Sequence, residues 1–189
     1  MGTGVQGTGP EEVSDARGTL RAMPRPIAHS ASVPASVDKV HAALVSEQYW
    51  KDRIDGIGGP GAQLVSVTAV NGTISVVMTQ SIPEDELPAA VTAFKKGPLV
   101  IERTESWGPL GGNRAEGKFG ATVEGAPASI SGTTLLEGDS TSSTTSLSGT
   151  TEVKIPIFGS KIESMISEQV LALIDNEHDF TGEWIDKNL

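Results

Sequence analysis

The most regular hydrophobic pattern in the chain lies near its C-terminus and has the period of a helix. In KIESMISEQVLALIDNEHDFTGEWI, which starts at residue 161, apolar side chains recur every three or four positions. This spacing places them on one face of an α-helix and predicts one long amphipathic helix over residues 161–188. Glu177 falls within the apolar stripe. Its carboxylate is therefore expected to face whatever the helix covers.

Shorter patterns at the start of the chain predict a strand and then two short helices. Residues 27–33 (IAHSASV) alternate as a first strand would. The following VPASVDKVHAALVSEQYWKDRI has apolar residues at helical spacing with a break near Ser46, and Ser36 is placed as an N-cap. We therefore expect two short helices after the first strand.

Alternation with a period of two dominates the middle of the chain and predicts a series of strands. AQLVSVTAV and TISVVMTQSI flank Asn71-Gly72, a pair that favours a tight type I′ hairpin. A short helix is expected around residues 88–95, and four more strands follow in LVIERTESW, RAEGKFGATVE, APASISGTTLLE and TTSLSGTTEVKIPI. The order predicts an α+β fold. A curved antiparallel sheet of about seven strands would have the long C-terminal helix over its concave face.

The strand LVIERTESW carries charge on its inner face. Alternation puts Arg103 and Glu105 on the same face as Ile101 and Trp107. A buried carboxylate without a partner is costly, so Arg103 is a candidate partner for Glu177. Alternatively, Glu177 lies at the open end of the sheet and meets water. The charged residues could form a structural network or could anchor the polar group of a ligand.

Small residues recur on the inner faces of the later strands, among them Ala115, Gly117, Ala121 and Gly149. Small side chains leave space under a curved sheet, so either the helix packs deeply or a cavity remains. The small residues leave both arrangements open, and we favour the cavity once the family resemblance described below is counted. The candidate ligand-binding residues that would line it are Met78, Ile101, Arg103, Glu105, Phe119, Val123, Leu147, Ile166, Leu173 and Glu177.

Composition and charge narrow the organisation and the partners. The 189 residues include 37% hydrophobic and 20% charged residues, as expected for one folded domain. Residues 1–22 have no hydrophobic period, which predicts a disordered tail ahead of a domain over residues 23–189. The net charge is −10 with no Lys/Arg cluster, which argues against nucleic acid and against an anionic membrane surface. No apolar run approaches the ~20 residues of a membrane helix. A cytoplasmic location is expected.

Sequence motifs for catalysis or for metal binding are not found. The three histidines do not pair at HxH or HExxH spacing, there is no cysteine, and there is no GxSxG motif. The glycine-rich GIGGPG at residues 56–61 matches neither a dinucleotide motif nor a Walker motif. The sequence therefore predicts no metal, no cofactor and no specific catalytic residue.

Three segments in a fixed order resemble a known family. They are VPASVDKVHAALVSEQYW, IERTESW and EVKIPIFGSKIESMISEQV followed by F and EWI. Together they resemble an actinobacterial family of uncharacterised proteins, DUF2505, within the START-like (SRPBCC) superfamily. The resemblance extends from Pro24 to about Ile185. It implies a helix-grip fold, in which a curved antiparallel sheet grips a long C-terminal helix around a hydrophobic cavity.

The resemblance implies a cavity but no particular activity, because the superfamily includes lipid and hormone carriers, polyketide cyclases and oxygenase subunits. Our leading hypothesis is binding or transport of an apolar small molecule, lipid-like or polyketide-like, in the cavity. The alternative is an enzyme of the cyclase/aromatase or hydrolase type that uses Glu177, Arg103 or Glu105 for proton transfer. A third possibility is an interaction module whose cavity is filled by its own side chains. Protein partners are not predicted.

Overall fold

The computed structural model describes residues 24–59, 61–87, 89–93, 95–154 and 159–189. The tail expected over residues 1–22 lies outside the described residues. The backbone of residues 159–167 is described as helix, but of their side chains only that of Ser164 is described. Ile166, a candidate cavity residue, therefore also lies outside the described side chains.

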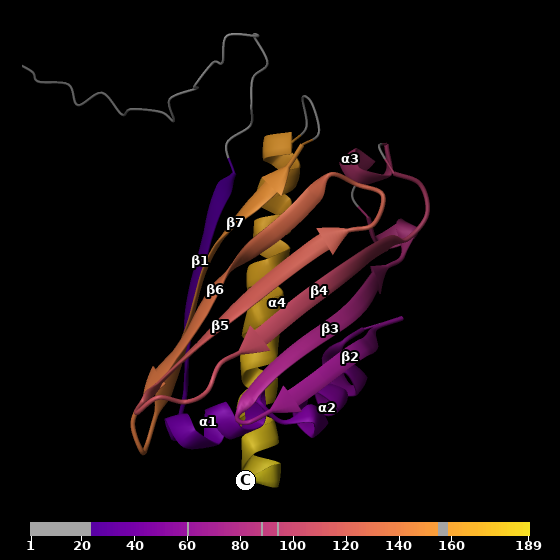
Figure 1. Cartoon of the computed structure of the whole chain (residues 1–189). Coiled ribbons are helices and arrows are strands. Elements are labelled where there is room, and N and C mark those ends of the chain that lie inside the picture. The colour runs from indigo at the N-terminus through magenta and orange to yellow at the C-terminus, as the bar shows by residue number, and fades with distance from the viewer. Residues whose placement is uncertain (1–23, 60, 88, 94, 155–158) are drawn as a thin grey trace, which may run out of the picture.

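The described residues form one curved sheet, a long helix and several short helices (Figure 1). This is the predicted α+β architecture, with the predicted two helices after the first strand. In chain order the elements are β1 (Arg25–Val33), α1 (Val37–Leu44), α2 (Glu47–Ile57), β2 (Gln63–Val70), β3 (Thr73–Ile82), the 3-10 turn η1 (Glu84–Glu86), α3 (Ala89–Thr92), β4 (Leu99–Trp107), β5 (Arg114–Val123), β6 (Ala128–Gly138), β7 (Ser143–Val153) and α4 (Gly159–Asn188).

The sheet is antiparallel throughout, with the strand order β1-β7-β6-β5-β4-β3-β2. Strands β2 to β7 follow one another in space as in sequence, and β1 pairs with β7 from Arg25 opposite Thr151 to Val33 opposite Ser143. The predicted hairpin is present, because Asn71 and Gly72 have φ of 51° and 73°. Figure 1 shows the strands crossing in front of α4, which runs along one face of the sheet.

Helices α1 and α2 close one end of the space between the sheet and α4. Their N-caps are Ser36 and Ser46, whose hydroxyls accept from the backbone N–H groups of Lys39 and Tyr49. Both helices pack against α4, and Trp184 Nε1 of α4 donates to Asp52 Oδ2 of α2 at 2.8 Å. The core cluster at this end includes Tyr49, Trp50, Met78, Trp107, Leu136 and Trp184.

The glycines of the inner face do not leave open space, so that part of the sequence argument was wrong. A Cβ added to Gly117 would lie 2.5 Å from both Ser106 O and Thr134 Oγ1. A Cβ added to Gly149 would lie 2.8 Å from Cζ of Phe119. The chain needs glycine at these two positions because neighbouring strands and the Phe119 ring approach closely. Space under the sheet has to come from elsewhere.

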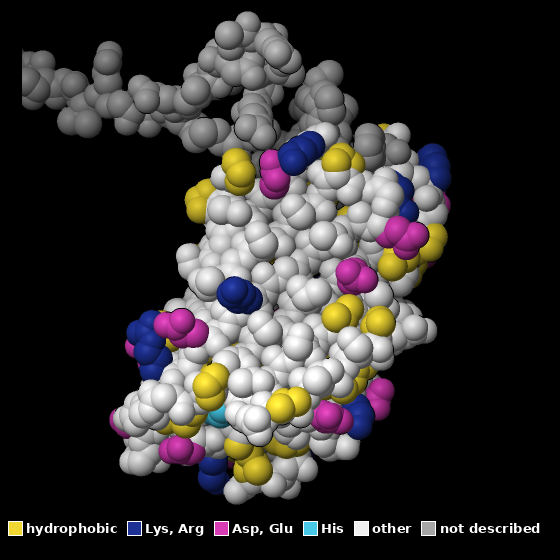
Figure 2. Space-filling model, viewed as in Figure 1, with side chains coloured by type: hydrophobic (Ala, Val, Ile, Leu, Met, Phe, Trp, Pro, Cys, Tyr) yellow, Lys and Arg dark blue, Asp and Glu magenta, His cyan; other side chains and the backbone are white. Residues whose placement is uncertain are grey.

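The outer face of the sheet is covered mainly by small polar side chains and backbone, as Figure 2 shows. Strands β6 and β7 expose Ser131, Thr133, Ser148 and Thr150 there. A site for an apolar ligand is therefore expected on the inner face, which α4 covers. Among the described residues, no helix has the length and apolar character needed to cross a membrane.

Candidate functional site

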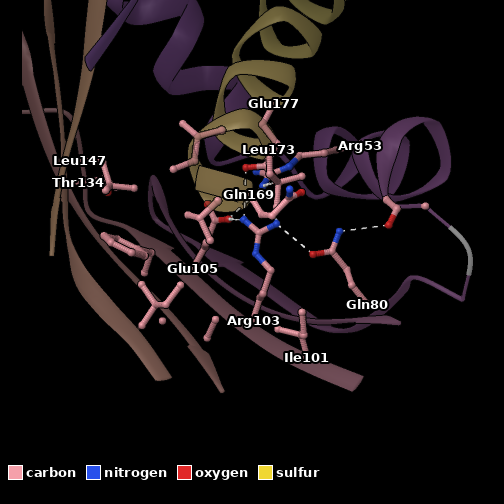
Figure 3. A pocket seen from close by; sticks show the side chains of 18 of the residues that line it. Arg53, Gln80, Ile101, Arg103, Glu105, Thr134, Leu147, Gln169, Leu173 and Glu177 are labelled. Carbon is pink, nitrogen blue, oxygen red and sulfur yellow. Dashed lines mark hydrogen bonds and ion pairs between the residues drawn. The ribbon is translucent and has the colours of Figure 1, made fainter. Parts of the chain in front are cut away.

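A pocket of about 610 Å³ lies between the inner face of the sheet and α4. Strands β3 to β7 and helices α2 and α4 all contribute side chains to its wall (Figure 3). Most of the wall is apolar. The apolar lining residues include Leu87, Leu99, Ile101, Phe119, Val123, Ile130, Leu147, Val170 and Leu173.

Four charged side chains form a buried ion-pair network in the wall of this pocket. Arg53 Nη2 lies 3.0 Å from Glu105 Oε1 and 2.5 Å from Glu177 Oε1. Arg103 lies 2.7 Å from Glu177 Oε1 through Nη1 and 2.9 Å from Glu105 Oε1 through Nη2. No side chain of the four is more than 14% exposed. We call Arg53, Arg103, Glu105 and Glu177 the buried tetrad.

Three elements that are distant in sequence bring the buried tetrad together. Arg103 and Glu105 lie two residues apart on β4, and both therefore point inward. Glu177 comes from α4 and Arg53 from α2, where the Arg53 guanidinium stacks over the Trp50 ring at 4.5 Å. The network positions α2 and α4 against β4.

Gln80 on β3 extends the network at one side. Its Oε1 accepts from Arg103 Nη1 at 3.2 Å, and its Nε2 donates to the carbonyl oxygen of Gly58 at 3.1 Å. Gln80 and Gly58 both line the pocket, and Figure 3 shows Gln80 beside Arg103. Gln80 thus links Arg103 to the loop that follows α2.

The buried tetrad is held in its charged form. Burial alone would raise the pKa of Glu177, but the Arg103 and Arg53 guanidiniums outweigh it and lower this pKa from 4.5 to about 2. For the two arginines, burial opposes the charged form, but Glu105 and Glu177 raise the pKa of both Arg53 and Arg103 above the ordinary value. Glu177 is therefore a carboxylate at neutral pH and a weak base.

A second set of hydrogen bonds joins α2 to α4 beside the buried tetrad. The Thr181 hydroxyl donates to the backbone carbonyl of Glu177 at 2.7 Å. Because its hydrogen is used there, the Tyr49 hydroxyl must donate to Thr181 Oγ1, at 2.8 Å. Burial raises the pKa of Tyr49, so this donor keeps its proton at neutral pH.

The buried tetrad lies in the pocket wall between two groups of apolar side chains. Along β4, Leu99 and Ile101 precede the charged residues and Trp107 follows them. All three line the pocket, and Trp107 also belongs to the core cluster. Along α4, Leu173 precedes Glu177 and lines the pocket, whereas Trp184 follows it and belongs to the core cluster. The pocket therefore has apolar walls around one group of buried charges.

The structure places eight of the ten predicted cavity residues on the pocket wall. Met78 differs, because it is fully buried in the core cluster. Ile166 lies outside the described side chains. Of the two arrangements left open for Glu177, the structure has the one in which it pairs with Arg103. The eight on the wall are Ile101, Arg103, Glu105, Phe119, Val123, Leu147, Leu173 and Glu177.

The polar residues of the wall that sequence reasoning did not assign to the cavity include Arg53, Gln80 and His178. A signal for Arg53 was present. It lies four residues after Tyr49 and three after Trp50, so it shares the buried face of its helix. Gln80 alternates with Met78 on the inner face of its strand, which is the corresponding signal for that residue.

The histidines do not gather into a metal site. His41 Nε2 donates to Gly108 O at 2.9 Å, and His29 Nε2 lies 2.8 Å from Asp175 Oδ1. His178 Nδ1 donates to Ile174 O at 3.0 Å. Within the part of the chain that the structure describes, no three His, Cys, Asp or Glu side chains are placed to hold a metal ion together.

Solved structures with a similar fold include one bacterial enzyme and one plant enzyme. The Zhui aromatase/cyclase from Streptomyces sp. R1128 has a TM-score of 0.58 at 11% identity, covering 87% of this chain and 95% of its own. Norcoclaurine synthase from Thalictrum flavum has a TM-score of 0.53 at 16% identity, covering 97% of this chain and 98% of its own. At these identities the similarity shows the fold alone. The fold is the helix-grip fold of START-like proteins, as the resemblance implied.

Sequence comparison gives the family. Uncharacterised proteins of Mycobacterium tuberculosis and Mycobacterium bovis are 34% identical over 174 residues, which is 88% of this chain and 100% of each relative. The family model described as "Protein of unknown function (DUF2505)" matches residues 28–185. With this match and these relatives, the chain belongs to the DUF2505 family.

Proposed function

We propose that this protein binds or transports an apolar small molecule, lipid-like or polyketide-like, in the pocket between the sheet and α4. The observation that carries the proposal is the pocket of about 610 Å³, whose walls are largely apolar around one group of buried charges. Pockets of this size and character suit drug-sized ligands. Burial of apolar ligand surface, at ~25 cal/mol per Å² before the costs of association, would drive binding.

The names of similar structures support a small molecule as the ligand. One neighbour is an aromatase/cyclase, and another is norcoclaurine synthase in a complex with dopamine and hydroxybenzaldehyde. Those are properties of the neighbouring proteins. They support our proposal only because the same fold there surrounds a site for small organic molecules.

The first test is uptake of N-phenylnaphthylamine, an uncharged apolar fluorescent probe. We expect its fluorescence to rise and saturate with the parent protein. Ala121 on β5 lines the pocket and lies opposite Arg103 of the neighbouring strand β4. Ala121→Leu therefore fills part of the pocket and should weaken uptake of the probe on the order of tenfold. Fluorescence titration with a melting curve for each variant measures both effects.

Thr122→Leu is the matched control, because Thr122 lies on the same strand but is exposed on the outer face. It adds the same side chain without entering the pocket and should leave uptake unchanged. The proposal is contradicted if the parent protein takes up no apolar probe, or if both leucine variants bind it as well as the parent.

An enzyme of the cyclase/aromatase or hydrolase type remains the second candidate, and His178 is the observation in its favour. His178 lines the pocket, and its Nδ1 donates to Ile174 O, so the neutral ring carries its lone pair on Nε2. With its pKa lowered to about 2, Glu177 is a poorer group for proton transfer at neutral pH. Turnover of an apolar ester or polyketide-like probe, lost in His178→Gln while N-phenylnaphthylamine is still bound, would favour the enzyme.

A further inference from the structure

The charges that face the pocket are balanced. The buried tetrad contains two guanidiniums and two carboxylates, and its net charge is zero. Among the described lining residues, Glu86 is the one Asp, Glu, Lys or Arg outside the buried tetrad, and it is exposed; His178 also lines the pocket. A ligand with an ionised head group would therefore add an uncompensated charge to a site with little access to water.

Three guanidinium nitrogens of the buried tetrad already contact the carboxylates of Glu105 and Glu177. Arg103 Nη1 donates to Glu177 and Gln80, and Arg103 Nη2 donates to Glu105 and Glu177. Arg53 Nη2 is shared between the two carboxylates. A ligand carboxylate that bound these three nitrogens would have to displace Glu105 or Glu177, leaving a buried anion without its partner.

One strong acceptor of the buried tetrad is not engaged. The hydrogen bonds and ion pairs that Glu105 makes among the described residues all end on Oε1. Glu105 Oε2 is not among the buried side-chain atoms that lack a partner, so it is open to the pocket or to solvent. An ionised carboxylate oxygen accepts hydrogen bonds and cannot donate, so it selects a donor on the ligand.

We propose that the ligand is an uncharged molecule with an apolar body and a hydroxyl group, and that its hydroxyl donates to Oε2 of Glu105. This inference rests on the proposed function and names the class of ligand for the same pocket. The apolar body then lies against Ile101 and Leu173, which lie next to the buried tetrad in the pocket wall (Figure 3). An acid or an amine of the same shape fits the walls equally well but brings a charge that the balanced tetrad does not match.

The test is displacement of N-phenylnaphthylamine by decanol, decanoate and decylamine at about pH 8, where the acid and the amine are ionised. The three competitors share the same apolar chain and differ in the head group. We expect decanol to displace the probe at concentrations on the order of tenfold lower than either ion. Because the parent protein is compared with itself, this ranking does not depend on the stability of any variant.

Two variants alter the charge balance in opposite directions. Glu105→Gln removes the carboxylate acceptor and leaves one excess positive charge, so decanoate should gain about tenfold relative to decanol. Arg103→Gln leaves one excess negative charge and should favour decylamine instead. Glu102→Gln is the matched control, because Glu102 lies on the same strand with its side chain exposed on the outer face. It should keep the parent ranking.

The outcomes separate this inference from the proposed function. If the parent binds the probe but decanoate or decylamine competes as well as decanol, the pocket does bind apolar molecules and the inference about the head group is wrong. If the head-group ranking in Glu105→Gln equals that of the parent, the assigned acceptor is wrong. If the parent does not bind the probe, the proposed function fails, and this inference fails with it.

Discussion

Replacing Arg53 with Met is expected to lower the free energy of unfolding by about 4 kcal/mol. Arg53 is 5% exposed and bridges both carboxylates of the buried tetrad, so its loss leaves two buried anions with one cation. Methionine keeps an apolar side chain against Trp50, which confines the change mainly to charge. Urea denaturation of the parent and the variant at neutral pH measures the difference in the free energy of unfolding. The dependence of that free energy on urea concentration is compared between the two proteins.

The double variant Arg53→Met with Glu177→Gln tests the cause. It restores a net charge of zero in the buried tetrad, so it should be more stable than Arg53→Met alone. Arg114→Met is the surface control, because Arg114 pairs with Glu116 and Glu137 but is 52% exposed. It should change stability little. A small effect of Arg53→Met, equal to that of Arg114→Met, would mean that the buried tetrad contributes no more than a surface ion pair.

The stability that Glu177 contributes should depend on pH. Because its folded-state pKa is lowered from 4.5 to about 2, its contribution is complete above pH 4.5 and is lost as the pH falls through 2. The difference between the two values corresponds to about 3 kcal/mol. We therefore expect Glu177→Gln to be less stable than the parent by about this amount at pH 7.

The same two proteins should approach equal stability as the pH falls from 4.5 towards 2, since the parent then also carries an uncharged group at this position. Other carboxylates titrate in both proteins, so their effect cancels in the difference. Urea denaturation at pH 7, 4.5 and 3 measures that difference. A constant gap over this range would show that Glu177 stabilises the fold by packing or shape and not by its charge.

Local patterns predicted the fold and part of the pocket. The Asn71-Gly72 hairpin, the N-cap at Ser36 and the helical stripe that contains Glu177 each depend on neighbours within a few residues. Alternation along β4 likewise placed Arg103 and Glu105 on the inner face. These features were accessible because periodicity and turn chemistry act over short distances in sequence.

The rest depends on how distant elements meet. Met78 lies on the inner face as alternation requires, but it is fully buried in the core cluster and does not line the pocket. Gly149 was predicted to leave space, but the Phe119 ring from another strand lies over it. Arg53 was not among the predicted site residues, and a charged residue in a helix usually faces solvent. Only the packing of α2 on β4 and α4 makes it a member of the site.

The buried tetrad also bears on the order of events in folding. Arg103 and Glu177 are 74 residues apart, and Arg53 and Glu105 are 52 apart. Closing loops of this size is entropically costly, and Glu177 lies on α4, the last in chain order of the described elements. Until α4 docks, the two arginines near Glu105 outnumber their carboxylate partners. The ion pairs of Glu177, which form when α4 docks, therefore mainly slow unfolding. Their removal should raise the unfolding rate more than it lowers the folding rate.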